Sequence, residues 1–187
     1  MSTVAASNSS AQDAVDLNPI RPPETYTEHL EDDATELPGI SDFVRAAGAM
    51  NIAICPDCKN IAFLVRKAGS PQLWITSSEG CAITQLTDGN GVTDFAWSPD
   101  SRHILVAADN DGNGLEAYNI VDADGQNLRE IISARKNGYR QFGSFSPDGS
   151  KIIFASTERN GLDYDSYITD VQSGETEKIF EGKFAFY

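Results

Sequence analysis

The chain has 187 residues, of which 40% are hydrophobic and 9% aromatic, a composition typical of a folded domain rather than a disordered chain. Its 28 acidic and 14 basic side chains give a formal net charge of −14, which argues against nucleic acid or an anionic membrane as a partner. We interpret the acidity as an aid to solubility, with steering of a cationic ligand as the alternative. The sequence has no run of about 18 apolar residues, so no transmembrane helix is expected.

The first part of the chain lacks the pattern of a folded domain. Residues 1–24 are rich in Ser, Ala and Asn, and they have neither a basic side chain before Arg21 nor the apolar core of a signal peptide. We therefore predict a disordered acidic leader over residues 1–39 and, with only three cysteines in the chain, a cytoplasmic location. Apolar residues at positions i, i+3, i+4 and i+7 then predict one face of a short helix, formed by Ile40, Phe43, Val44 and Ala47.

From Asn51 onward, short apolar runs alternate with turn residues, and the pattern repeats. A turn with a central Pro-Asp pair occurs three times, and its prolines are 43 and 48 residues apart, close to the length of a four-stranded propeller blade. Each proline is followed by an Ile five residues later, then by an aromatic residue that opens another strand, a glycine turn and a last short strand. The prolines are Pro56, Pro99 and Pro147, the isoleucines Ile61, Ile104 and Ile152, and the turn glycines Gly80, Gly125 and Gly174.

The residue types in each repeat have a physical reason. Pro presets the backbone angle of the second turn position, and Asp, Ser and Gly suit the positions that follow. The strand after each turn is apolar almost throughout, as residues 61–65 and 104–108 illustrate, and this predicts burial on both faces between neighbouring blades. Such a unit cannot bury its faces alone, so it requires neighbours.

We predict an all-β fold, a partial β-propeller over residues 40–187 that is preceded by the disordered leader and the short helix. It comprises about three four-stranded antiparallel blades and the start of a fourth. The chain is therefore interpreted as a fragment of a longer propeller. The blades are expected at residues 49–88, 91–133 and 141–181, and the first strand of the fourth at residues 182–187.

Two longer stretches carry a resemblance to a known family. One runs from Asp94 through the second turn to Gly112, and the other from Phe142 through the third turn to Asp170. Together with the repeated turn, they resemble the N-terminal β-propeller of prolyl-oligopeptidase-type serine peptidases, which include dipeptidyl aminopeptidases and acylaminoacyl peptidases, over roughly residues 40–187. The turn itself is shared with TolB-like propeller repeats.

The chain departs from that family at one turn and in its extent. Cys58 stands where the family usually has glycine, so a different backbone conformation is expected in the first turn. The resemblance implies that the propeller restricts and orients peptide substrates for a catalytic α/β-hydrolase domain, which would carry the Ser-His-Asp triad and is absent from this chain. The implied partners are that C-terminal domain, further blades and a peptide substrate, with no nucleic acid and no membrane.

The sequence is also compatible with two other interpretations. A TolB-like propeller would be a non-catalytic protein-interaction module, with further blades and no hydrolase domain. A degenerate fragment would have no function of its own. The sequence downstream of Tyr187 is the observation that would distinguish these possibilities best.

No catalytic residue is predicted within the chain. The Gly-x-Ser-x-Gly motif of a hydrolase nucleophile is absent, and the only histidines are His29 and His103, so a Ser-His-Asp arrangement has no motif behind it. Some subfamilies recognise the amino terminus of a peptide with acidic side chains of the propeller. Glu158, Asp163 and Asp165 stand in a long loop that would allow this, but we interpret them as part of a solvated loop.

No cofactor and no metal site are predicted either. Cys55 and Cys58 form a C-x-x-C pair, but a zinc site would need a second pair and only Cys81 remains, so the repeat assigns both to the turn. Residues 109–114 open like a calcium loop, but Ile120 stands where the bidentate Glu is expected. We therefore predict an ordinary hairpin loop there.

Overall fold

The computed structural model describes residues 20–21, 27–28, 48–66, 70–80 and 82–183. Every regular element within these ranges is a β-strand, which confirms the all-β prediction. The predicted helix at residues 40–47 lies outside the described residues, as does most of the predicted fourth-blade strand. The strands are β1 (Thr27–Glu28), β2 (Met50–Ile54), β3 (Asn60–Arg66), β4 (Pro71–Ser77), β5 (Ile83–Gln85), β6 (Val92–Trp97), β7 (His103–Ala108), β8 (Ala117–Asp122), β9 (Arg129–Ile132), β10 (Arg140–Phe145), β11 (Lys151–Ser156), β12 (Asp165–Asp170) and β13 (Thr176–Phe180).

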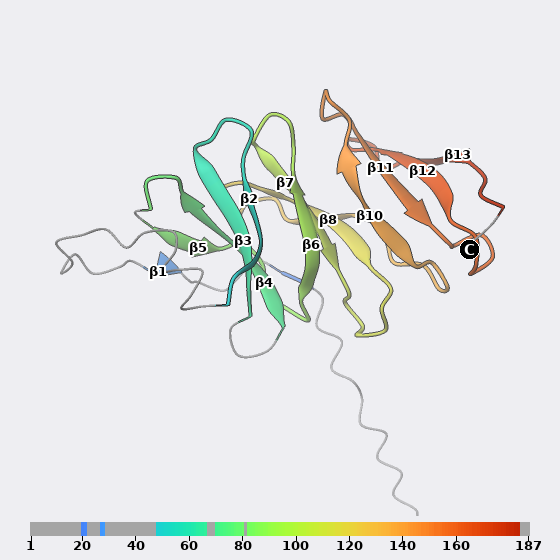
Figure 1. Ribbon diagram of the computed structural model, residues 1–187, viewed down its shortest axis with the longest axis horizontal. Coiled ribbons are helices and arrows are strands. Elements are labelled where there is room, and N and C mark those ends of the chain that lie inside the picture. The colour runs from blue at the N-terminus through green and yellow to red at the C-terminus, as the bar shows by residue number, and fades with distance from the viewer. Residues whose placement is uncertain (1–19, 22–26, 29–47, 67–69, 81, 184–187) are drawn as a thin grey trace, which may run out of the picture.

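The strands form three antiparallel sheets that stand side by side in chain order like a fan (Figure 1). Blade 1 comprises β2–β5, blade 2 comprises β6–β9 and blade 3 comprises β10–β13, and within each blade the strands pair in sequence order. The first strands of the blades are neighbours, because β2 contacts β6 and β6 contacts β10. This arrangement confirms the predicted partial propeller of three four-stranded blades.

Three of the four described residues of the predicted leader, Arg21, Thr27 and Glu28, pair with blade 1 or with the connection that follows it. β1 adds a fifth strand to the outer edge of the blade, with Thr27 opposite Thr84. Arg21 forms an isolated antiparallel bridge with Asp88. The structure differs here from the predicted disorder, because pairing with a sheet edge uses backbone groups that every sequence supplies. The remainder of residues 1–39 lies outside the described part of the chain.

Two apolar cores fill the spaces between the blades. The inner strands β3 and β7 are buried along almost their whole length, as predicted from their apolar sequence. In β11, by contrast, Ile153 is 42% exposed, because no described blade covers the far face of blade 3. The core between blades 1 and 2 comprises Ala62, Leu64, Leu73, Ile75, Leu86, Val92, Phe95, Ile104, Val106, Ala108 and Val121, together with Ile20. The core between blades 2 and 3 comprises Leu105, Ala107, Tyr118, Ile132, Ile152, Phe154 and Tyr167.

The three Pro-Asp turns adopt one structure. Cys58, Ser101 and Gly149 occupy the same turn position, with φ angles of 62°, 62° and 74°. In each turn the N–H of this residue donates to the carbonyl oxygen of the first turn residue, at 2.8 to 3.0 Å. The expectation of a different conformation at Cys58 is therefore wrong. The turn imposes the left-handed region on whatever residue stands there, and a non-glycine residue bears the steric cost.

The turn aspartates explain why the sequence change at Cys58 leaves the turn intact. In the third turn, the Asp148 carboxylate accepts from Ser146 Oγ at 2.6 Å and from the N–H of Ser150 at 3.1 Å. The hydroxyl of Ser146 and the two donors of Ser150 lower the pKa of Asp148 to about 2. Asp57 and Asp100 accept the equivalent two hydrogen bonds in the other turns. The repeated carboxylate thus holds each turn closed.

Replacing Cys58 by Gly should stabilise the chain by about 1 kcal/mol, because glycine adopts a positive φ without steric cost. The side chain of Cys58 is exposed, so its removal costs no core packing. The free energy of unfolding, measured by urea denaturation, checks the change. Gly149→Ala is the matched control and should lose about the same amount, since it introduces the same strain. A loss of stability in Cys58→Gly would contradict this account of the turn.

Candidate functional site

The connections of the three blades divide between two faces of the fan (Figure 1). The Pro-Asp turns, which join the first and second strands of each blade, lie on one face. The loops between the second and third strands and the connections between blades lie on the opposite face, which we call the loop face. Loops on a rigid scaffold of this kind are where propellers can present binding groups. The described segments of the loop face are residues 86–91, 109–116, 133–139 and 157–164.

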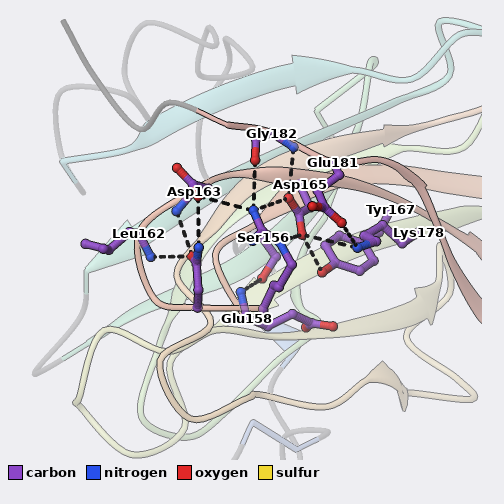
Figure 2. Close-up of polar contacts among 11 residues, drawn as sticks. Ser156, Glu158, Leu162, Asp163, Asp165, Tyr167, Lys178, Glu181 and Gly182 are labelled. Carbon is purple, nitrogen blue, oxygen red and sulfur yellow. Dashed lines mark hydrogen bonds and ion pairs between the residues drawn. The ribbon is translucent and has the colours of Figure 1, made fainter.

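The loop of blade 3 ends in a cluster of ion pairs (Figure 2). Asp165 is the first residue of β12, and its side chain has no exposed surface. Arg159 donates to both of its oxygens, from Nε to Oδ2 at 2.7 Å and from Nη2 to Oδ1 at 3.2 Å. The same Nη2 donates to Asp163 at 3.2 Å and to the carbonyl oxygen of Gly182 at 2.8 Å. One guanidinium therefore joins the loop, the strand and the segment after β13.

The Asp165 carboxylate is fully engaged within the chain. The N–H of Gly182 donates to Oδ1 at 2.9 Å, and Lys178 Nζ lies 3.9 Å from Oδ2 (Figure 2). The hydrogen bonds from Arg159 outweigh the burial and hold the pKa of Asp165 below its usual range. The prediction of a solvated loop is therefore wrong for Asp165, because its buried carboxylate connects the loop to the segment after β13 through hydrogen bonds. Asp163 keeps 22% of its side chain exposed.

A buried arginine joins blades 2 and 3 at the loop face. Arg140 is the first residue of β10, and its side chain has no exposed surface. Its guanidinium carbon lies 5.3 Å from the ring centre of Tyr118 and 5.4 Å from that of Phe154, and the two ring centres are 5.6 Å apart, so the cation lies beside both aromatic rings. It also donates to the carbonyl oxygens of Glu116 and Ser133, the latter at 2.6 Å.

Two carboxylates lie near the guanidinium of Arg140, and neither forms a short ion pair with it. Glu158 Oε2 lies 3.9 Å from Arg140 Nη2. Burial raises the pKa of Glu116, although Thr93 Oγ1 donates to its carboxylate at 2.6 Å. Burial also lowers the pKa of Arg140, and its Nε is buried without a hydrogen-bond partner among the described residues. The charge at this junction is therefore stabilised mainly by rings and carbonyl oxygens.

Replacing Arg140 by Lys should lower the free energy of unfolding by about 2 kcal/mol, because an ammonium group cannot contact both rings and reach two carbonyl oxygens as the planar guanidinium does. Urea denaturation measures the loss. Arg135→Lys is the control, since Arg135 is an exposed residue of the adjoining connection and should be insensitive to the same change. Equal stability of Arg140→Lys and the unchanged chain would rule out a specific role for the guanidinium.

A pocket of about 400 Å³ opens between blades 1 and 2, on the side of the loop face. This volume lies within the range of about 300–1,000 Å³ that is typical of small-ligand sites. Arg66 and Asp109 supply one charge of each sign, and the other lining groups are mostly apolar or amide groups. The lining residues are Met50, Asn51, Leu64, Arg66, Pro71, Asn90, Gly91, Val92, Thr93, Asp109 and Gly112.

His103, for which the sequence predicts no catalytic role, has a structural role. His103 Nδ1 lies 2.7 Å from Asp122 Oδ1, and the two residues are directly paired across β7 and β8. The nearby hydroxyl of Ser98 donates to Asp100 and accepts from the N–H of His103. That hydroxyl is committed to the turn and is therefore no nucleophile for the pair. His29 lies outside the described residues.

The two sequence patterns that resemble metal-binding motifs, the C-x-x-C pair and residues 109–114, also have structural roles. Cys55 is buried in the first turn, where its thiol donates to Asp57 at 2.8 Å, and Cys58 is exposed. Asp109 turns its carboxylate toward its own loop, as a hairpin loop predicts. No group of three or more potential metal ligands occurs in the part of the chain that the structure describes. The Asp109 carboxylate accepts from the backbone N–H groups of Asp111, Asn113 and Gly114, at 2.7 to 3.3 Å.

The geometry of the loop face suits binding or exclusion of a ligand by charge and shape. Neither the Arg159 cluster nor the Arg140 junction places a nucleophile beside a general base. Sequence reasoning missed both arginines, because an arginine in an acidic chain resembles any other surface charge. The one local signal was the i, i+4 spacing of Arg159 and Asp163, which is common on protein surfaces.

Within the described ranges there is no helix long and apolar enough to cross a membrane.

No protein-family model matches the chain. Two curated proteins match part of its sequence. Dipeptidyl-peptidase 5 of Porphyromonas gingivalis is 28% identical over 102 residues, and the match covers 48% of this chain and 14% of that protein. The uncharacterized peptidase YuxL of Bacillus subtilis is 26% identical over 151 residues, covering 60% of this chain and 23% of that protein. The chain thus spans less than a quarter of the length of either relative.

Solved structures share the propeller fold. A putative TolB from Agrobacterium tumefaciens matches with a TM-score of 0.58 and 22% identity, over 72% of this chain and 51% of that one. The β-propeller domain of the trilobed protease from Pyrococcus furiosus matches with a TM-score of 0.57 and 20% identity, over 72% of this chain and 43% of that one. At these identities the structures show the fold alone. With two peptidases among the sequence relatives, the predicted resemblance to propellers of prolyl-oligopeptidase-type peptidases is confirmed.

Proposed function

We propose that the chain is the N-terminal propeller portion of a serine peptidase, and that it restricts and orients peptide substrates for a catalytic α/β-hydrolase domain outside these residues. The observation that carries the proposal is that both sequence relatives are peptidases of which this chain matches only 14% and 23%. Most of each relative therefore lies beyond the matched part, and a propeller next to a hydrolase domain can control which peptides reach it by size and charge.

The far face of blade 3 supports the presence of further blades. Ile153 pairs directly with Ile168, so both side chains lie on one face, and Phe180, opposite Ser166, lies on the same face. Ile153 is 42% exposed and Phe180 is 64% exposed. In a propeller, apolar surface of this kind packs against the next blade. We propose that a fourth blade covers it.

The charge of the chain favours a peptide over a polyanion as the ligand. A formal net charge of −14 repels nucleic acid and anionic membranes, and it attracts the free amino terminus of a peptide. The cytoplasmic location predicted from the N-terminal composition and the cysteine content is part of the same proposal.

The test uses the whole product of the reading frame that contains this chain. A fluorophosphonate probe, which reacts with activated serines, should label one serine outside residues 1–187. The unchanged protein should cleave short fluorogenic peptides and spare unfolded casein. A variant with a loosened propeller, Gly143→Ala, should lose that size selection. Absence of any labelled serine would contradict the peptidase proposal, and casein cleavage by the unchanged protein would contradict the filtering role.

The alternative is a TolB-like propeller that acts as a non-catalytic interaction module. The similarity to a putative TolB favours it, because that protein shares the fold over 72% of this chain. The same experiment separates the two functions. A whole product without a reactive serine, but with a stable protein partner in cross-linking, would favour the interaction module.

A further inference from the structure

The junction of blades 1 and 2 holds a short segment that precedes both blades. Ile20 is 8% exposed and belongs to the apolar core between these blades. Arg21 and Asp88 exchange both backbone hydrogen bonds, at 2.5 and 2.6 Å, as neighbouring residues of antiparallel strands do. The guanidinium of Arg21 lies 3.0 Å from Asp88 Oδ2, and the N–H of Ile20 donates to Asn110 Oδ1 at 3.3 Å.

The groups that receive this segment are oriented by the blades themselves. The N–H of Gly89 donates to Asp88 Oδ1 at 3.0 Å and leaves Oδ2 for the arginine. Asn90 Nδ2 donates to the carbonyl oxygen of Asn110 at 2.5 Å, which links the connection after blade 1 to the loop of blade 2. We call Asp88, Asn90 and Asn110, with the apolar core beneath them, the junction groove. Because its polar groups have partners of their own, the groove loses little freedom when an occupant enters.

We propose that the junction groove is a docking site for an extended peptide in which an aliphatic residue precedes an arginine, and that Ile20 and Arg21 are its resident, exchangeable occupant. The backbone of Asp88 selects an extended conformation, the core accepts the aliphatic side chain, and the carboxylate of Asp88 selects the basic one. This inference goes beyond the proposed function, since it concerns a peptide site built between two blades and filled by the chain itself.

The resident segment is suited to exchange. The Arg21–Asp88 ion pair is 48% and 38% exposed, so it contributes selectivity more than affinity. We expect an occupant that relies mainly on one buried side chain, a backbone bridge, a hydrogen bond to Asn110 and an exposed ion pair to bind weakly from solution. Its covalent tether raises its effective concentration to roughly the millimolar range, and this keeps the groove filled in the resting chain. Removing the two side chains should therefore open the groove to a peptide from outside.

Fluorescence anisotropy of a labelled peptide with the sequence of residues 17–25 tests the proposal. The full chain carrying Ile20→Gly and Arg21→Gly should bind this peptide at least about tenfold more tightly than the unchanged chain, because no tethered competitor remains. A peptide with both residues replaced by glycine should not bind. Asp88→Asn in the opened chain should weaken binding about threefold. Equal binding by the opened and unchanged chains, with circular dichroism showing both folded, would overturn the proposal.

A second measurement needs no variant and covers the case in which the opened chain is unstable. In the unchanged chain, an excess of the peptide should displace the resident segment. Hydrogen exchange at the amide of Arg21 should then accelerate, while the amide of Asp88 stays protected by the incoming backbone. Exchange at Arg21 that is unaffected by millimolar peptide would show that the segment is a fixed part of the fold, and this result would also overturn the proposal.

Discussion

Replacing Asp165 by Asn should lower the melting temperature of the chain by at least about 5 °C. The side chain is fully buried and receives two hydrogen bonds from Arg159. An amide of the same shape leaves the guanidinium without its counter-charge and turns an NH₂ group toward donors, including the N–H of Gly182. Thermal unfolding followed by circular dichroism at pH 7 measures the effect.

Asp163→Asn is the matched control for this prediction. It makes the same chemical change beside the same arginine, but Asp163 is 22% exposed and accepts one bond from Arg159, at 3.2 Å. Its melting temperature should fall by only about 1–2 °C. If the melting temperature fell equally in the two variants, the burial of Asp165 would make no added contribution to stability.

The effect of Asp165→Asn should also depend on pH, with a definite sign. The pKa of Asp165 is lowered in the folded chain, chiefly by the hydrogen bonds from Arg159. A lowered pKa contributes stability that is fully present above the unfolded-state value, about 3.9, and is lost as the pH falls through the folded-state value. Asn does not titrate, so the stability difference between the two proteins should be constant near neutral pH and shrink below about pH 4. A difference that grows in acid would contradict this assignment.

Replacing Gly143 by Ala should lower the free energy of unfolding by at least about 3 kcal/mol. A Cβ atom on Gly143 would lie 1.7 Å from the carbonyl oxygen of Ile153 and 2.7 Å from its carbonyl carbon, so the clash is with backbone that cannot rotate away. Gly143 stands where the pairing of β10 with β11 shifts register between Gln141 and Ser144, and glycine permits this close approach. Urea denaturation measures the loss.

Gly112→Ala separates this clash from ordinary backbone strain. Gly112 has a φ of 66° and nothing within 4 Å of the position of a Cβ atom, so the substitution introduces strain without a clash. Its cost should be about 1 kcal/mol. If Gly143→Ala cost no more than Gly112→Ala, the close approach of β10 to β11 would be ruled out.

The fold was largely predictable because its signals are local. The Pro-Asp turns close mainly through bonds between residues at most five positions apart, as from the N–H of Lys151 to Ser146 Oγ, so a short stretch of sequence contains most of the cause. The apolar runs predicted inner strands for the same reason, since burial on both faces leaves no polar position in the run. The conformation at Cys58 was missed because the residue type suggested a different turn, whereas the surrounding hydrogen bonds decide it.

The candidate sites were less predictable, because their partners are distant in the sequence. Asp165 and Gly182 are 17 positions apart, and Arg21 and Asp88 are 67 apart. No periodicity or motif relates such positions. The leader was predicted to be disordered from its composition, yet backbone pairing of Arg21 with Asp88 depends on geometry and hardly on composition.

By itself, the sequence determined the blade repeat, the turn structure and the absence of a hydrolase motif, because each depends on neighbouring residues or on residue types alone. Only the tertiary structure decided which charges are buried. Arg140 lies beside rings from two blades, and Asp165 lies beneath the loop that holds Arg159, because packing of whole blades removes these side chains from water. The tertiary structure likewise decided that Ile20 belongs to the core, since the groove that receives it exists only where two blades meet.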